Sequence, residues 1–144
     1  EVQTTVSGDR VPTGTTFLTV MGRRVGSEYY GGRVRLAADG SVQLHVTRGG
    51  GTPVAGGVVS GLTFAADDVL RVRLQVTGTS PTTVRAKVWR DGTAEPSAWG
   101  ASATDSTASL QVAGAVGLQS YLGGAGGSPQ VAFAWDDLWA GAPA

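Results

Sequence analysis

Apolar and polar residues alternate along most of this chain, and this period of two restricts the possible folds more than any other feature of the sequence. Residues 33–36 alternate between arginine and an apolar side chain before the pair Asp39-Gly40, and the alternation resumes over residues 42–46. Successive side chains of a β-strand point to opposite faces, so each run predicts a strand with one apolar face. An Asp-Gly pair between two such runs predicts a hairpin, because both residues tolerate a positive φ. Residues 70–77 and 84–89 predict a second hairpin in the same way.

About ten strands are expected in all, at the spacing that is typical of all-β domains. The remaining ones are predicted at residues 2–7, 17–25, 54–60, 109–112, 116–122 and 130–139. Residues 91–107 are expected to form a long ordered loop, and residues 65–68 a short helical turn. Because each clear strand has one apolar face, we predict an all-β, two-sheet antiparallel β-sandwich. An up-and-down barrel would satisfy the same alternation and is the alternative.

The composition sets limits on partners. The 144 residues fit one domain, expected at residues 1–141, with residues 142–144 as the start of a linker. Eleven basic and eleven acidic residues cancel, which argues against a nucleic-acid partner. No stretch approaches the roughly 20 apolar residues of a membrane span, so membrane insertion is not expected. The absence of cysteine excludes a disulfide framework and a thiolate metal site.

Several short motifs follow one another in a characteristic order. They are Tyr29-Tyr30, the runs 33–36, 39–44, 69–74 and 84–89, Gly117-Leu118 and the closing run 135–138. In this order they resemble the laminin-G-like, concanavalin A-like jelly-roll modules of large secreted bacterial proteins, and the resemblance covers residues 1–141. It implies a secreted, extracellular module of the carbohydrate-binding or adhesion type. Such modules usually begin with one or two strands before the segment that matches residues 1–7, so we expect either that those first strands are lacking or that a sheet has an open edge.

The resemblance does not extend to catalysis. The glucanases of this fold carry Glu-x-Asp-x-Glu or a close variant on one strand, which brings the two carboxyl groups of glycoside hydrolysis to one face. Besides Glu1, the chain has only Glu28 and Glu95, and no predicted strand carries two acidic residues two positions apart. The only histidine is His45, and there is no Gly-x-Ser-x-Gly elbow. We therefore predict that the chain is not an enzyme.

The pair Asp136-Asp137 is the candidate metal site. The resemblance implies a structural Ca²⁺ held by an acidic residue of the closing strand together with backbone carbonyls. Calcium takes several oxygen ligands, and Asp9 or the pair Asp67-Asp68 could supply more of them. The alternative is that Asp136 and Asp137 are two solvated carboxylates.

Aromatic and basic residues on the polar faces of strands are the candidate ligand contacts. Trp89 and Tyr121 lie in phase with polar residues, Tyr30 precedes a Gly-Gly pair that leaves room, and His45 shares a polar face with Gln43. Six cations also project from polar faces and would form a basic stripe for acidic glycans or carboxylates if their strands are neighbours: Arg33, Arg35, Arg71, Arg73, Arg85 and Lys87. A solvated face is the alternative. The predicted ligand-binding set is Trp89, Tyr121, Tyr30, Arg35, Arg73, Arg85 and His45.

Two functions from different classes fit these features. The first is a non-catalytic module that binds a glycan or a cell-surface polysaccharide within a larger secreted protein. The second is a structural subunit or spacer of an extracellular assembly, in which a neighbouring domain or a strand-donating protomer completes an open sheet edge.

Overall fold

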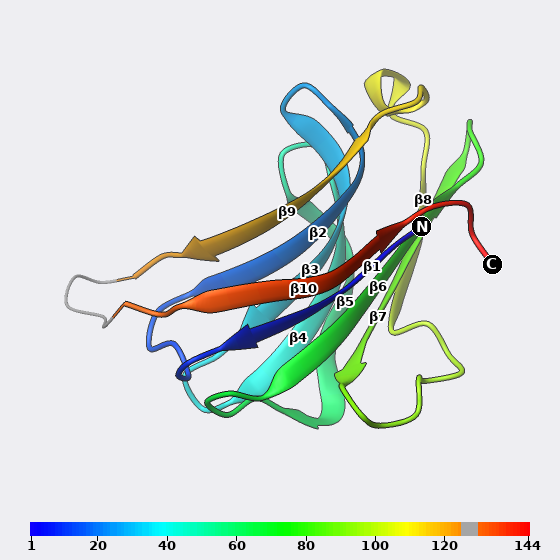
Figure 1. The fold of residues 1–144 in the computed structure, drawn as a ribbon. Coiled ribbons are helices and arrows are strands. Elements are labelled where there is room, and N and C mark those ends of the chain that lie inside the picture. Colours follow the sequence, from blue (N-terminus) through cyan, green and yellow to red (C-terminus); the bar gives the residue numbers. More distant parts are fainter. Residues whose placement is uncertain (125–129) are drawn as a thin grey trace.

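The chain folds into two facing five-stranded sheets, as a computed structural model that describes residues 1–124 and 130–144 shows (Figure 1). In spatial order the first sheet contains β10 (Phe133–Ala140), β1 (Val2–Gly8), β6 (Val69–Thr77), β7 (Thr82–Arg90) and β8 (Ala101–Asp105). The second sheet contains β5 (Thr52–Thr63), β4 (Ser41–Arg48), β3 (Glu28–Leu36), β2 (Thr16–Val25) and β9 (Ala115–Leu122). All neighbouring strands pair antiparallel. The predicted two-sheet antiparallel β-sandwich is therefore confirmed, and the barrel is not formed.

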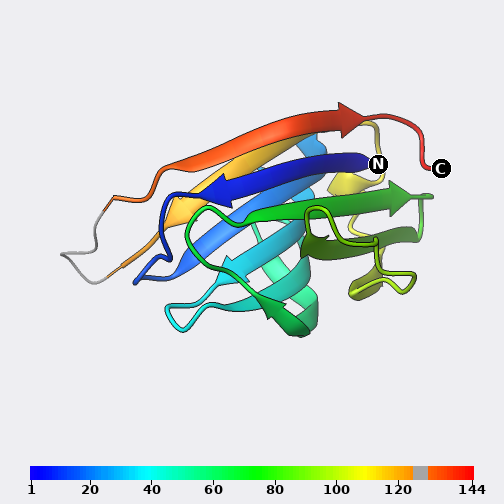
Figure 2. The ribbon, with the colours of Figure 1, turned by 60° about the horizontal axis from the view of Figure 1, so that its bottom comes forward.

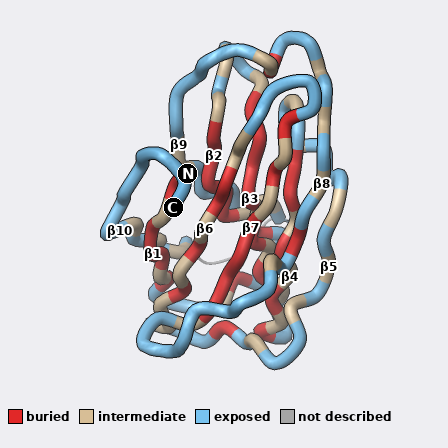
Figure 3. Tube along the Cα trace, turned by 90° about the vertical axis from the view of Figure 1, so that its right-hand side faces the viewer, coloured by how far each residue is buried: buried red, intermediate tan, exposed pale blue. Residues whose placement is uncertain are grey.

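The core lies between the sheets, where their apolar faces meet. The largest fully buried side chains are Tyr30, Leu18, Leu36, Leu44, Leu70, Leu74, Leu110, Val6, Val20, Val34, Val42 and Val46. Each buried leucine or valine stabilises the fold by about 1.5–3 kcal/mol relative to an exposed one. Figure 3 shows the buried segments in the central strands, whereas β5, β9 and β10 are largely exposed. The alternation of the sequence thus separates a core face from an outer face in each sheet.

Both predicted hairpins are present. In the first, Leu36 of β3 lies opposite Val42 of β4. Its turn contains Gly40 at a φ of +83°, a conformation that glycine adopts without steric cost. The amide of Ser41 donates to Asp39 Oδ1 at 2.9 Å and supports the turn. The second hairpin joins β6 to β7.

Three local predictions were wrong. Residues 109–112 do not form a strand: η1 (Ala108–Leu110) is a short 3₁₀ helix, which buries Leu110 in the core. The predicted loop 91–107 contains strand β8, in which small alanines alternate with short polar residues. Alanine is depleted in strands, so this alternation gives a weak signal. Residues 65–68 form a turn and not a helix, with the amide of Asp68 bonded to the carbonyl of Ala65.

The two ends of the chain lie side by side at one end of the sandwich (Figure 2). The backbone nitrogen of Glu1 donates to the carbonyl of Gly141 at 2.8 Å, next to the pairing of β1 with β10. Residues 142–144 follow beyond this contact. In the part of the chain that the structure describes, no helix is long and apolar enough to cross a membrane.

Candidate functional site

The seven predicted ligand-binding residues do not form one surface. Arg73, Arg85 and Trp89 come from β6 and β7 of the first sheet. Arg35, His45 and Tyr121 come from β3, β4 and β9 of the second sheet. Tyr30 belongs to neither outer face. The structure therefore offers two candidate faces, which differ in how their charges are paired.

Tyr30 lies in the core, where its side chain is fully buried. Its hydroxyl donates to Asp105 Oδ2 at 2.7 Å and accepts from Gln111 Nε2 at 3.0 Å. Burial raises the pKa of Tyr30, and its hydrogen bond to the Asp105 carboxylate raises it further. On β3, Tyr30 occupies the same alternate positions as the core residues Val34 and Leu36, so its side chain points inward. Its neighbour Tyr29 points to the outer face.

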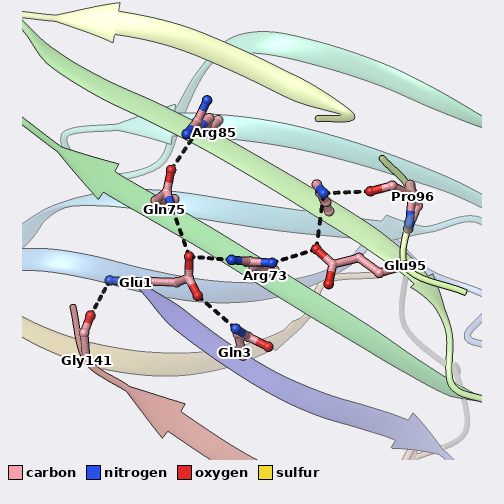
Figure 4. A network of polar contacts seen from close by, with 9 residues as sticks. Glu1, Gln3, Arg73, Gln75, Arg85, Glu95, Pro96 and Gly141 are labelled. Carbon is pink, nitrogen blue, oxygen red and sulfur yellow. Dashed lines mark hydrogen bonds and ion pairs between the residues drawn. The ribbon is translucent and has the colours of Figure 1, made fainter. Parts of the chain in front are cut away.

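Two cations of the first sheet, Arg73 and Lys87, are held by carboxylates of the protein itself (Figure 4), whereas Arg85 forms no ion pair with any described residue. Arg73 donates to Glu1 Oε2 at 2.9 Å and to Glu95 Oε1 at 2.7 Å. Lys87 Nζ donates to the same Glu95 oxygen at 3.1 Å and to the carbonyl of Pro96 at 2.6 Å. Burial would raise the pKa of Glu95, but the hydrogen bonds from Arg73 and Lys87 outweigh it and lower that pKa. These charges are compensated within the protein.

The segment 91–100 covers part of the same face. Its Trp99 ring lies 4.6 Å from the Arg85 guanidinium carbon and 4.7 Å from Lys87 Nζ, which are cation–π distances. Arg85 Nε also donates to Gln75 Oε1 at 2.7 Å. Trp89 is only 8% exposed. Arg73 and Arg85 therefore have structural contacts that a ligand at this face would have to displace, and Trp89 is buried.

The outer face of the second sheet brings together residues that are far apart in the sequence. One row across the strands runs from Tyr121 through Phe17 and Arg35 to Gln43. The next row contains Gln119, Thr19, Arg33 and His45. Two of the predicted residues thus share the first row, and His45 lies in the second.

Aromatic rings and hollows occupy the centre of this face. The rings of Phe17 and Tyr121 are stacked with centroids 6.0 Å apart, and the Arg33 guanidinium lies 4.3 Å from the centroid of Phe17. A shallow hollow of about 420 Å³ is lined by Phe17, Ser27, Tyr29, Arg33, Gly50, Gln119 and Tyr121. A second hollow of about 280 Å³ is lined by Thr15, Phe17, Arg33, Arg35, Gln43, His45 and Pro53. Both hollows share Phe17 and Arg33, so they adjoin each other on this face, and we call the two hollows together the furrow.

Several polar groups on this face have no bonding partner among the described residues. Arg33 and Arg35 form no ion pair with any described residue. Arg33 Nε is buried and has no hydrogen-bond partner among the described residues; the same holds for the hydroxyls of Thr19 and Thr47 on this sheet and for Arg73 Nε on the first sheet. Burial lowers the pKa of His45, and the charges of Arg33 and Arg35 lower it further. The imidazole is therefore neutral at pH 7.

Several residues of the furrow were absent from the predicted set, namely Phe17, Tyr29, Arg33 and Gln119. Their phase on the strands marked them as outward-facing. The pairing of β2 with both β3 and β9 was the missing information, because β9 lies about a hundred residues away from β2 along the chain. Alternation alone does not show which strands are neighbours.

The predicted metal residues lie exposed on β10. The Oδ1 atom of Asp136 accepts from the amide of Asp137, and Asp137 Oδ2 lies 3.8 Å from Arg71 Nη2. Asp9 bonds to the amide of Ala132, and Asp68 pairs with Arg90. Within residues 1–124 and 130–144, no three His, Cys, Asp or Glu side chains lie together in a group that could hold a metal ion. The Ca²⁺ site stays a prediction, which the effect of a chelator on the melting temperature tests.

Comparison of the chain with family models, with curated proteins and with solved structures finds no match. The resemblance to concanavalin A-like modules therefore stays a prediction, and the function has to be argued from the surface itself.

Proposed function

We propose that this chain is a non-catalytic carbohydrate-binding module of a larger secreted protein, and that it binds a glycan along the furrow of the second sheet. The observation that carries the proposal is the furrow, where Arg33 and Arg35 have no acidic partner among the described residues and lie beside the stacked rings of Phe17 and Tyr121. Binding sites typically combine apolar walls with a few polar groups that fix the orientation of the ligand. The proposed location is extracellular, at a cell surface or on a polysaccharide.

The chemistry of the furrow suits a pyranose. An aromatic ring offers a flat apolar face to the C–H side of a sugar ring, and Tyr121 is 51% exposed. Gln119, Gln43 and the arginines supply amide and guanidinium groups for the hydroxyls. A shallow and open hollow suits a segment of a polymer better than an isolated small molecule.

The absence of a carboxyl group from the furrow lining supports a non-catalytic role. Glycoside hydrolysis usually requires two carboxyl groups that flank the scissile bond. The described residues that line the two hollows include no aspartate and no glutamate. Binding without hydrolysis is therefore the proposed activity.

The test is retention on a panel of immobilised polysaccharides. Tyr121→Ala is expected to weaken retention by about tenfold or more, because aromatic anchors of an interface contribute on the order of 1.4 kcal/mol or more. Trp139→Ala is the matched control, since Trp139 is similarly exposed at 47% but lies on β10 of the other sheet. Retention that is unchanged in Tyr121→Ala, or lost equally in both variants, would contradict the proposed face.

A second candidate is a structural subunit that accepts a strand from a neighbour. β9 and β10 are edge strands on the same side of the sandwich, where Trp135 Nε1 donates to Ser120 Oγ at 2.9 Å. Both strands carry exposed apolar side chains, namely Val116, Tyr121, Leu122, Leu138 and Trp139. Unpaired edges of this kind are templates for strand addition.

Sedimentation at increasing protein concentration separates the two candidates. A strand-accepting subunit would form larger species as the concentration rises, and Leu138→Lys would reduce them because a charge on an edge opposes strand pairing. A chain that stays monomeric at all concentrations and binds no added strand would exclude this second candidate.

A further inference from the structure

The two outer faces of the sandwich carry similar cations but differ in how far acidic side chains of the protein compensate them. On the first sheet, Arg73 and Lys87 bond to the carboxylates of Glu1 and Glu95. In the furrow of the second sheet, the charged side chains among the lining residues are Arg33 and Arg35, and His45, whose pKa is lowered, lines the second hollow beside them. The furrow therefore has a net positive charge that the described part of the protein does not compensate.

A partly buried cation that has no counter-ion within the protein can bind an incoming anion without first breaking an ion pair. Arg33 is the clearest case: its Nε is buried and lacks a partner within residues 1–124 and 130–144, as that of Arg73 does, but unlike Arg73 it also forms no ion pair there. Arg35 lies two residues along the same strand and on the same face, which places the two backbone positions about 6.6 Å apart. Guanidinium groups bind carboxylates with paired, directional hydrogen bonds.

We propose that the glycan bound in the furrow is acidic, a polymer of uronic acids whose carboxylates are bound by Arg33 and Arg35. This proposal rests on the proposed function and specifies the substrate class of the same site. The aromatic pair contacts the apolar face of one sugar ring, and the arginines bind the carboxylates of that ring and of its neighbour. The two hollows on either side of the Phe17–Arg33 contact accommodate at least two consecutive units.

The uronate carboxylate is favoured over a neutral sugar by the charges that the furrow leaves unpaired. Neutral hydroxyls can bond to a guanidinium, but they leave its charge uncompensated. A carboxylate compensates it, and hydrogen bonds between charged groups are roughly twice as strong as neutral ones. The same cations on the first sheet would have to release Glu1 or Glu95 before they could bind a ligand.

The test compares polygalacturonate, its methyl-esterified form and dextran sulfate, each titrated into the folded protein by calorimetry. Polygalacturonate is expected to bind at least about tenfold more tightly than the ester, because its carboxylates accept charge-assisted hydrogen bonds from the arginines and the uncharged ester groups do not. Arg33→Gln/Arg35→Gln is expected to lose at least about tenfold in affinity for polygalacturonate and little for the ester. Arg10→Gln removes one cation at an exposed position away from the furrow and is the charge-matched control for the single variant Arg35→Gln.

Each outcome bears on one of the two proposals. Equal affinity for polygalacturonate and its ester would refute the acidic specificity while leaving a carbohydrate-binding module. Equal affinity for dextran sulfate would refute a carboxylate site in favour of a general anion site. Failure to bind any polysaccharide would refute the proposed function itself. The single variant Arg35→Gln, with a melting curve recorded beside each titration, separates lost binding from lost folding if the double variant is unstable.

Discussion

Replacing Tyr30 with phenylalanine removes one hydroxyl from the interior of the sandwich and is expected to destabilise the fold without weakening glycan binding. The Tyr30 hydroxyl donates to Asp105 Oδ2 at 2.7 Å. The same carboxylate accepts from Arg48 Nη1 and from the amide of Thr107, each at 2.9 Å. Burial would raise the pKa of Asp105, but these hydrogen bonds outweigh it and hold the pKa well below its usual range. At neutral pH the lost bond is therefore one to a charged and largely buried acceptor.

The magnitude follows from the partners that remain. A hydrogen bond to a charged group contributes about 1.5–3 kcal/mol to stability. Gln111 Nε2, which also donates to Tyr30, keeps the carbonyl of Thr107 as an acceptor at 3.1 Å, so the substitution leaves no buried donor unpaired. We expect Tyr30→Phe to lower the free energy of unfolding by about 1.5–3 kcal/mol, which for a chain of this length corresponds to a melting temperature roughly 4–9 °C lower.

The pH dependence gives this prediction a second signature. Asp105 has a lower pKa in the folded state than in the unfolded chain. Its contribution to the free energy of unfolding is therefore fully present above its unfolded pKa of about 4 and is lost progressively as the pH falls below that value. The difference in stability between Tyr30→Phe and the parent chain should be constant from pH 8 to 5 and shrink toward pH 3.

Urea unfolding followed by tryptophan fluorescence measures both effects, and a polygalacturonate titration at pH 7 measures binding. Tyr121→Phe, which alters an exposed hydroxyl, is the control and should leave stability unchanged. Weaker binding by Tyr30→Phe with unchanged stability would show that Tyr30 contacts the ligand and would refute its placement in the core. A difference that does not narrow in acid would refute the role assigned to the Asp105 carboxylate.

Two further predictions concern the two outer faces. Trp99→Ala should lower the free energy of unfolding by about 1–3 kcal/mol in urea titrations, because the Trp99 ring packs against three cations of the first sheet. The same variant should bind polygalacturonate as tightly as the parent chain. The affinity for polygalacturonate should be constant from pH 8 to 6.5 and should increase below the lowered pKa of His45. Protonation of His45 adds a third cation beside Arg33 and Arg35, and its neighbour on β5, Gly56, carries no charge. His45→Gln should remove that rise, and a rise that persists in His45→Gln would contradict the assignment.

The sequence was sufficient to predict the sandwich because its clearest strands have strong alternation. β3 and β4 carry valine and leucine at alternate positions around Asp39-Gly40, and every one of those apolar residues is buried. β8 was missed because its inward residues, Ala101 and Ala103, are too small to mark a strand. The strength of the prediction thus follows the size of the side chains that enter the core.

The site could be predicted only in part, because outward phase identifies exposed residues but not their neighbours. Arg35, His45 and Tyr121 were found from their phase and do share one face. Arg73 and Arg85 have the same phase and yet have structural partners, which no local pattern reveals. The decisive residues are Glu95 and Trp99, which lie on an irregular segment whose position depends on tertiary packing.

The face that is free to bind a ligand is therefore determined by the covering segment and not by the strands. Both sheets present arginines from alternating positions, so the number of cations does not distinguish them. On the first sheet an incoming carboxylate must compete with Glu1 and Glu95, which are covalently part of the chain and held at 2.7–2.9 Å from Arg73. Such tethered groups have a large advantage over a ligand that must be immobilised on binding. Arg33 and Arg35 have no such competitor among the described residues, so a carboxylate can bind them without displacing an acidic group of the protein.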